Sequence, residues 1–200
     1  MHQTGQKRYS KTTALVLCGI FAALMAICSF ITIPLGFTPV PINLATLGVF
    51  LTGGILGKKY GSISLIVYIL LGAVGVPVFA GFKGGLGVLA GPTGGYIIGY
   101  LAAAFLTGLL VELIFTKTGT DSGQRSAKSS TSRFIGIILA MIAGLAACYA
   151  LGTAWFMIST GTGLGAALIS CVIPFLPGDA AKIIVGALLV QKLRPAIPIR

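Results

Sequence analysis

Long apolar runs, broken only by prolines, glycines and short basic stretches, constrain this chain more than any other feature of its sequence. The first run, residues 14–31, is eighteen residues long and contains a single hydroxyl group. With its flanking residues it is long enough to cross the ~30 Å hydrocarbon core of a bilayer. Only 8% of the 200 residues are charged, whereas an ordinary soluble domain has about 25%. The sequence therefore predicts an all-α integral membrane protein.

The order of apolar runs and helix breakers predicts a single membrane domain over residues 1–200 with six transmembrane helices. These helices cover about 12–33, 43–57, 61–79, 94–115, 134–158 and 178–193. The first run is longer than the apolar region of a signal peptide, about 7–15 residues, so we expect it to be retained. The polar segment 116–132 lacks apolar periodicity and is predicted to be a water-exposed loop. Pro174 and Pro177 interrupt the apolar segment before the last span. We therefore expect a short re-entrant or interfacial helix there.

Basic residues predict the orientation through the positive-inside rule. Twelve of the fourteen lysines and arginines fall on one predicted face, namely Lys7, Arg8, Lys11, Lys58, Lys59, Lys117, Arg125, Lys128, Arg133, Lys192, Arg194 and Arg200. This asymmetry accounts for the net charge of +11 without nucleic-acid binding. It places both termini in the cytoplasm and predicts a multi-pass protein of the cytoplasmic membrane. The proline-rich loop 34–43, the glycine-rich stretch 80–93 and segment 159–179 then meet at the outer face.

Several classes of function lack the residues that they require. The single histidine, His2, lies in the polar N-terminal tail, and the four cysteines fall in apolar segments without CxxC spacing, so neither a metal nor a cofactor is expected. Residues 85–90 spell G-x-G-x-x-A, but a dinucleotide fingerprint requires a soluble βαβ unit around it. The chain has no G-K-[ST] triplet, so it cannot energise transport with ATP by itself.

The glycine-rich stretch 84–99 allows two interpretations. Gly87, Gly91 and Gly95 are spaced by four residues, as in surfaces where membrane helices approach closely. Residues 91–96, GPTGGY, instead combine a turn with a helix start, where backbone N–H groups lack helical partners and missing Cβ atoms admit a ligand. The second interpretation predicts the wall of a binding pocket.

Asp179 differs from the other two acidic residues. Asp121 lies in the predicted loop and Glu112 lies near a helix end, whereas Asp179 and Lys182 are i and i+3 at the start of an apolar helix. Charged groups within a membrane span usually pair, line a cavity or act on a ligand. The pair could simply neutralise itself near the outer interface. Alternatively, a carboxylate that accepts N–H bonds and an ammonium that donates to a carbonyl would match an N–H/C=O/N–H edge, such as a ureido ring.

Alanines on the first helix form a small-xxx-small pattern. Ala22 and Ala26 are spaced by four residues, with Ala23 beside them. Such a pattern serves either internal packing or the docking of another membrane protein.

Three segments carry a resemblance to the BioY family: VPVFAGFKGGLGVLAGPTGGYIIGY (76–100), FLPGDAAKIIVGALL (175–189) and the proline-rich loop after the first helix. BioY proteins are the biotin-binding S components of energy-coupling factor (ECF) transporters. The resemblance implies a six-helix fold whose pocket captures biotin from outside, without chemistry on it. It also implies assembly with a transmembrane coupling subunit and two cytosolic ATPases, although uptake by the chain alone remains an alternative.

The same resemblance implies roles for individual residues. Asp179 and Lys182 would hydrogen-bond the ureido ring, and loop 34–43 would act as a lid. The remaining pocket residues would be Thr93, Gly94, Gly95, Tyr96, Pro92, Phe79 and Asn43. Lys83 and backbone N–H groups are both candidates for the biotin carboxylate. The alanines Ala22, Ala23 and Ala26 would contact the coupling subunit.

Two functions of other classes remain open on the residues alone. One is a self-sufficient, ion-coupled permease for another small vitamin or metabolite. The other is an intramembrane enzyme that uses Asp179 and Lys182 as an acid–base pair, although no nucleophile lies in register with them.

Overall fold

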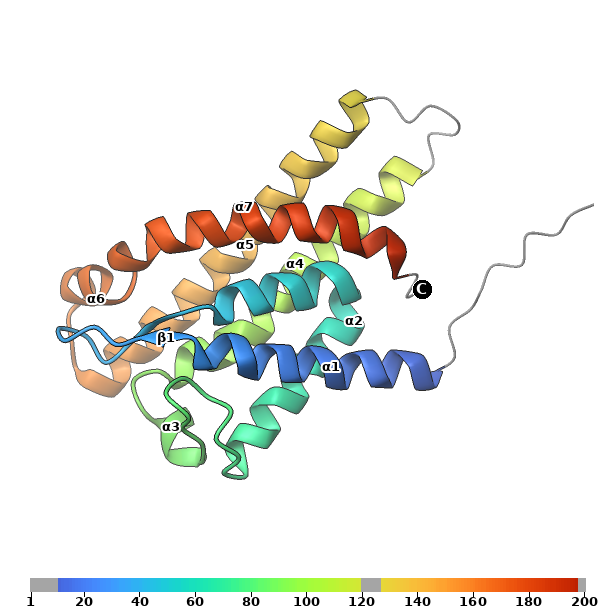
Figure 1. The fold of residues 1–200 in the computed structure, drawn as a ribbon. Helices are drawn as coiled ribbons and strands as arrows, with labels where there is room; N and C mark the ends of the chain where they lie inside the picture. Colours follow the sequence, from blue (N-terminus) through green and yellow to red (C-terminus); the bar gives the residue numbers. More distant parts are fainter. Residues whose placement is uncertain (1–10, 120–126, 198–200) are drawn as a thin grey trace, which may run out of the picture.

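The computed structural model describes residues 11–119 and 127–197, which fold almost entirely into helices (Figure 1). The α-helices are α1 (Lys11–Phe30), α2 (Ala45–Ala73), α3 (Leu86–Ala90), α4 (Gly94–Gly119), α5 (Ala127–Thr160), α6 (Leu164–Cys171) and α7 (Leu176–Leu193). Two short strands, β1 (Thr32–Ile33) and β2 (Ile42–Asn43), pair antiparallel between α1 and α2. Single 3-10 turns, η1 (Ile173–Phe175) and η2 (Arg194–Ala196), flank α7.

A kink at Gly57 divides α2 into two halves that run in different directions (Figure 1). Gly57 has φ 79° and ψ −179°, a conformation that is essentially restricted to glycine. The freed N–H of Lys58 donates to Glu112 Oε1 at 3.1 Å, and Lys58 Nζ lies 3.8 Å from Glu112 Oε2. Glu112 therefore caps the second half of α2 from the neighbouring helix α4.

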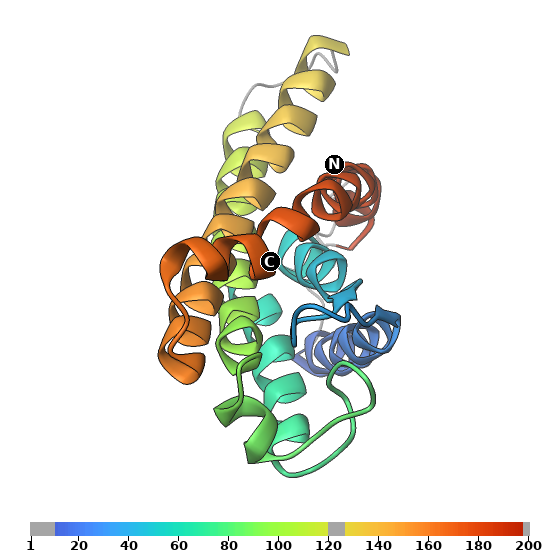
Figure 2. The ribbon, with the colours of Figure 1, turned by 90° about the vertical axis from the view of Figure 1, so that its left-hand side faces the viewer.

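The helices form two crossing layers (Figure 2). One layer contains α1, the first half of α2 and α7; the other contains the second half of α2 together with α4 and α5. Every residue from Gly48 to Gly57 is buried, as expected of a helix that is apolar on all sides and lies inside the bundle. The first half of α2 is thus the central helix of its layer.

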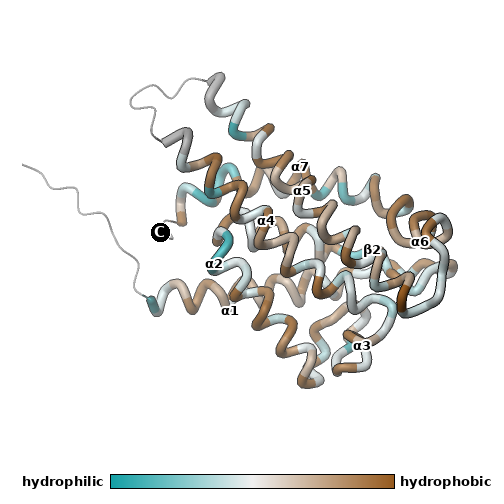
Figure 3. Tube along the Cα trace, turned by 180° about the vertical axis from the view of Figure 1, so that it is seen from behind, coloured by the Kyte–Doolittle hydropathy of each residue, from teal (hydrophilic) through white to brown (hydrophobic). Residues whose placement is uncertain are grey.

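Five segments of the described chain are long and apolar enough to cross a membrane: Lys11–Phe30, Ala45–Ala73, Gly94–Thr116, Ser130–Thr160 and Leu164–Ala196. When the two halves of α2 are counted separately, this number agrees with the six predicted helices. Apolar residues recur along the length of these helices (Figure 3), and many of the large ones are exposed. Ile158, for example, is 80% exposed and Leu15 is 64% exposed. The predicted all-α membrane fold is confirmed.

The helix boundaries differ from the predicted ones at several ends. The helix predicted over 12–33 ends at Phe30, because residues 32–33 pair with residues 42–43 in the hairpin. The helix predicted to reach 79 ends at Ala73, just before Gly75 with φ 103°, a left-handed conformation that commonly follows a helix end. Hydropathy could not show this end, because residues 74–79 are as apolar as the helix before them.

The predicted loop 116–132 is shorter than expected. Helix α4 continues to Gly119 and α5 already begins at Ala127, and residues 120–126 lie outside the described residues. Polar composition alone does not end a helix that projects beyond the bilayer. The short helix predicted before the last span is present as α6, and it is followed by the turn η1, which contains Pro174.

The two ends of the bundle differ in charge. The start of α1, the Gly57 kink, the end of α4, the start of α5 and the end of α7 lie at one end (Figure 1), which carries Lys11, Lys58 and Lys192. The hairpin, α3 and α6 lie at the opposite end. This separation agrees with the sequence pattern that assigned basic residues to one face.

Replacing Gly57 with alanine should lower the free energy of unfolding by about 1–3 kcal/mol, because a side chain is strained at this φ and ψ. The added Cβ would also overlap the Glu112 carboxylate that caps Lys58. The free energy can be measured by titrating the purified protein with SDS. Gly165→Ala is the matched control, because no atom lies within 4 Å of its added Cβ and alanine favours the helix. Equal stabilities of the two variants would contradict the role of the kink.

Candidate functional site

A cavity of about 470 Å³ lies at the end of the bundle that carries the hairpin. Its walls come from the hairpin loop 34–41, the loop 79–83 and helices α1, α2, α4, α5 and α7. Cavities of this size, with apolar walls and a few polar groups, are typical of small-molecule sites.

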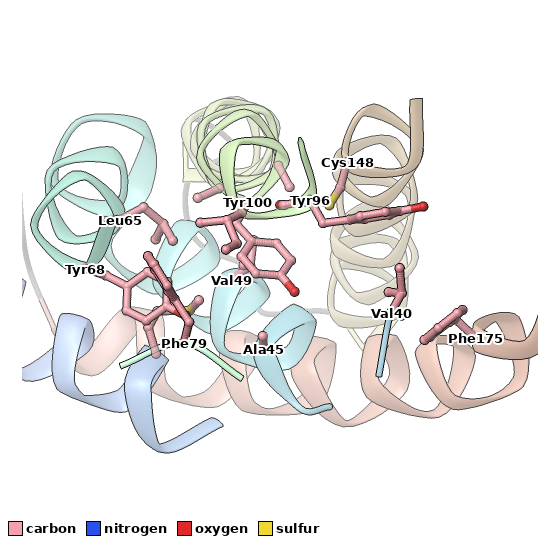
Figure 4. Packing of buried hydrophobic residues seen from close by; sticks show 14 of the residues in the cluster. Val40, Ala45, Val49, Leu65, Tyr68, Phe79, Tyr96, Tyr100, Cys148 and Phe175 are labelled. Atoms are coloured by element: carbon pink, nitrogen blue, oxygen red, sulfur yellow. Dashed lines mark hydrogen bonds between the residues drawn. The ribbon is translucent and has the colours of Figure 1, made fainter. Parts of the chain in front are cut away.

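The apolar walls belong to a buried cluster around this cavity, part of which Figure 4 shows. Tyr96 and Tyr100 project from α4, and Tyr68 packs edge-on against Phe79 with ring centroids 5.5 Å apart. Phe175 and Val40 add apolar surface from the η1 turn and the hairpin. A second buried cluster, which includes Phe50, fills the bundle outside this one.

The polar end of the cavity is centred on the carboxylate of Asp179, in the first turn of α7. Its Oδ1 atom accepts hydrogen bonds from Thr46 Oγ1 and from Lys182 Nζ, both at 2.8 Å. The Tyr149 hydroxyl donates to Oδ2, and Lys182 Nζ also donates to Thr46 Oγ1 at 3.1 Å. The side chains come from α2, α5 and α7, so three helices hold one carboxylate.

Burial makes this arrangement costly unless the charges are paired. Asp179 is 2% exposed and Lys182 is 9% exposed. Removing a carboxylate and an ammonium from water costs several kcal/mol per ion, which only close pairing and further hydrogen bonds offset. The helix N-terminus adds a favourable dipole at Asp179. The pair is therefore preorganised inside the cavity rather than solvated at an interface.

The structure brings six of the predicted pocket residues to the cavity wall. They are Asp179, Lys182, Thr93, Tyr96, Phe79 and Asn43. The Asn43 side chain accepts a hydrogen bond from Ala45 N at 3.0 Å at the start of α2. The Tyr96 hydroxyl lies 3.1 Å from Thr153 Oγ1 and donates to the carbonyl of Cys171 at 3.3 Å. Tyr96 thus links α4 to α5 and α6 as well as lining the cavity.

Three predicted pocket residues, Pro92, Gly94 and Gly95, do not line the cavity. A Cβ added at Gly94 would overlap the Leu89 carbonyl, and one at Gly95 would overlap the Trp155 side chain. These glycines allow α4 to pack against α3 and α5. Of the three glycines spaced by four residues, Gly95 therefore has the packing role, whereas an added Cβ at Gly87 would meet no atom within 4 Å. The Trp155 indole N–H also donates to the Gly91 carbonyl at 3.0 Å and ties this stretch to α5.

Several cavity residues were missed by sequence reasoning, most importantly Thr46 and Tyr149. Thr46 follows the proline-rich loop and Tyr149 lies in the middle of an apolar helix. Nothing in their local sequence separates them from ordinary membrane-helix residues. Their role depends on contacts with residues more than 25 positions away, namely 133 positions for Thr46 and 30 for Tyr149.

Two aromatic rings stack beside the cavity. Phe30 ends α1, Phe82 belongs to loop 79–83, and their ring centroids lie 4.4 Å apart with an interplanar angle of 22°. Phe82 has φ 57°, which is unusual for a residue other than glycine. The bridge between Phe79 and Lys83 holds this turn in place. Lys83, which also lines the cavity, directly follows Phe82 in the chain.

The alanines of α1 do not share one free face. Ala22 is only 4% exposed and Ala26 is partly buried against the core, whereas Ala23 is exposed. Gly19, one turn before Ala23, has no atom within 4 Å of an added Cβ. The predicted docking residue Ala22 therefore packs inside the protein, because its side chain points towards the bundle. Gly19 and Ala23, by contrast, are exposed small residues one turn apart on this helix.

A preorganised polar group at one end of an otherwise apolar cavity, enclosed by membrane-spanning helices, defines a membrane-embedded protein that binds a small molecule. The family model for the BioY family matches residues 2–199. The chain is 39% identical over 181 residues to "Biotin transporter BioY" of Thermotoga maritima, covering 90% of this chain and 95% of the relative. It is 36% identical over 189 residues to the protein of that name from Rhizobium etli, covering 94% and 96%. The chain belongs to the BioY family.

A solved structure supports the same assignment. The crystal structure of the S component for biotin from an ECF-type ABC transporter matches with a TM-score of 0.76 and 33% sequence identity, covering 92% of each chain. The present chain therefore has the S-component fold.

Replacing Lys182 with methionine should lower the free energy of unfolding by about 3 kcal/mol, because the Asp179 carboxylate is left buried without a cation. The double variant Asp179→Asn, Lys182→Met removes both charges and should recover more than half of this loss. SDS titration of both proteins measures the two values, with Lys59→Met as an exposed control. A double variant as unstable as Lys182→Met would contradict the pairing argument.

Proposed function

We propose that this protein binds biotin at high affinity in the cavity and takes part in its uptake as the S component of an ECF transporter. The observation that carries the proposal is the buried Asp179–Lys182 pair at the polar end of an apolar cavity. A carboxylate and an ammonium together complement a ureido ring, whose N–H groups donate and whose carbonyl accepts. The relatives named as biotin transporters and the solved biotin S component support the choice of ligand.

The rest of the cavity suits the rest of the vitamin. The apolar walls, including Tyr96, Phe79 and Val40, would enclose the sulfur-containing ring and the aliphatic chain. Lys83 and the backbone N–H groups of its loop are the candidates for the terminal carboxylate. The hairpin loop 34–41 covers one side of the cavity and would act as the lid. Binding alone is required of these groups, so the protein changes no covalent bond in its ligand.

Transport requires a source of energy outside this chain. We assign that role to a transmembrane coupling subunit and two cytosolic ATPases, because the sequence has no ATP-binding loop of its own. In the cytoplasmic membrane, the basic end of the bundle and both termini would face the cytoplasm. The cavity end would then face the outside. The exposed small residues Gly19 and Ala23 on α1 would allow close approach of a helix of the coupling subunit.

Biotin titration of the purified protein tests the ligand directly. Asp179→Asn preserves shape but removes a charge-assisted acceptor, so the affinity for biotin should fall about 10–150-fold. Asp121→Asn, the same change in the polar sequence segment 116–132, should bind biotin as the wild type does. Absence of saturable binding to the wild type would refute the function, and unchanged binding to a folded Asp179→Asn protein would refute the role of Asp179.

The coupling surface can be tested separately from binding. Ala23→Trp should reduce co-purification with the coupling subunit and ATPases at least tenfold, because a large side chain prevents close helix approach. Its biotin affinity should remain that of the wild type. Ala146→Trp, at an exposed position of α5, is the matched control and should co-purify normally. Equal recovery of the complex with both variants would exclude this face of α1.

A further inference from the structure

The donors and acceptors that remain unused at the polar end of the cavity indicate which groups of a ligand can be recognised there. Asp179 Oδ1 already accepts two bonds, from Thr46 and Lys182, and Oδ2 accepts one from Tyr149. A carboxylate offers about four acceptor positions. The described residues therefore leave one position, on Oδ2, for a ligand.

Within the described part of the chain, Lys182 retains one donor. Its ammonium has three N–H groups, and two of them are used by Asp179 and Thr46 at 2.8 and 3.1 Å. Thr46 Oγ1 both donates to Asp179 and accepts from Lys182, so its hydroxyl hydrogen is already used. A ligand carbonyl can thus be met by the third N–H of Lys182.

The hydrogen bonds around Asp179 determine whether the Tyr149 hydroxyl can donate to a ligand or accept from it. A phenolic hydroxyl has one hydrogen to donate and an oxygen that can also accept. In Tyr149 the hydrogen is already donated to Asp179 Oδ2. Tyr149 lines the same cavity as Asp179, and its oxygen receives no hydrogen bond from the described residues. Towards a ligand, Tyr149 can therefore act as an acceptor and not as a donor.

The polar end consequently offers two acceptors and one donor, from Asp179, Tyr149 and Lys182. A cyclic urea carries the complementary set of two N–H donors and one carbonyl acceptor. We propose that Tyr149 is a specificity-determining residue whose phenolic oxygen accepts a hydrogen bond from one ring N–H, while Asp179 accepts from the other. This inference rests on the proposed binding of biotin. It adds Tyr149 as the group that accepts a hydrogen bond from the second ring N–H.

A different role for the same contact makes the opposite prediction. If Tyr149 only positions Asp179, its loss weakens every ligand that Asp179 binds by the same factor. If Tyr149 accepts a hydrogen bond from a ligand N–H, removal of its hydroxyl lowers the affinity only for ligands that carry that N–H. Two isomeric cyclic carbamates separate these roles, because in each one an oxygen replaces a different ring N–H of biotin with little change of shape.

The experiment compares biotin and both carbamates on the wild type and on Tyr149→Phe. We expect the variant to bind biotin about 3–10-fold more weakly, as for the loss of a neutral hydrogen bond. One carbamate should bind the variant at least as well as the wild type, because oxygen facing the Tyr149 oxygen is repelled in the wild type. The other carbamate should lose affinity like biotin. Tyr60→Phe, outside the cavity wall, should leave all three affinities unchanged.

Equal losses for all three ligands would overturn the proposal while leaving biotin binding intact. If the wild type fails to bind biotin, the proposed function itself is wrong. Should Tyr149→Phe not fold, difluorotyrosine at position 149 preserves the hydroxyl but makes its oxygen a poorer acceptor. The affinity for biotin should then fall, whereas the affinity for one carbamate should not. If biotin and this carbamate both bind as tightly as to the wild type, or more tightly, the acceptor role is excluded.

Discussion

The buried carboxylate of Asp179 is the constraint on which the rest of the site depends. Its donors come from α2, α5 and α7, so the position of each of these helices is coupled to the others through one group. A buried charge with too few partners would destabilise the bundle, which means that this end of the protein must close around the carboxylate correctly. The same requirement leaves a defined set of donors and acceptors facing the cavity. Stability and ligand recognition therefore share one set of hydrogen bonds.

Glycines determine how the helices can surround that group. The kink at Gly57 changes the direction of α2 and lets its halves enter different layers, while Gly94 and Gly95 bring α4 against its neighbours. Without a strong hydrophobic force between helices in lipid, such close contacts supply much of the packing energy. These three glycines thus position the helices that form the cavity walls and do not themselves line the cavity.

The sequence predicted the site best from residue types that are rare in membrane helices, such as charged ones. It predicted less from the common apolar residues and glycines. Asp179 and Lys182 could be predicted as a pair because charges are costly in a membrane helix, and the structure places them in the cavity. The helices were found from apolar runs, but their ends were not, since turns such as residues 74–79 are equally apolar. Glycines in a GPTGGY turn fit packing and ligand contact equally well, so Gly94 and Gly95 were misplaced. The roles of Tyr149 and Ala22 depend on which face of their helix points into the protein. A single sequence without periodic polarity does not determine that face.

The bond between the Trp155 indole and the Gly91 carbonyl has a practical consequence. Trp155 is the only tryptophan in the chain, and its fluorescence depends on whether the indole N–H is bonded and how much water reaches it. The segment to which it is bonded leads directly into Thr93 and Tyr96 of the cavity wall. The protein thus contains a built-in optical reporter, with no other indole to obscure it, at the point where movement of the glycine-rich segment would be transmitted to α5.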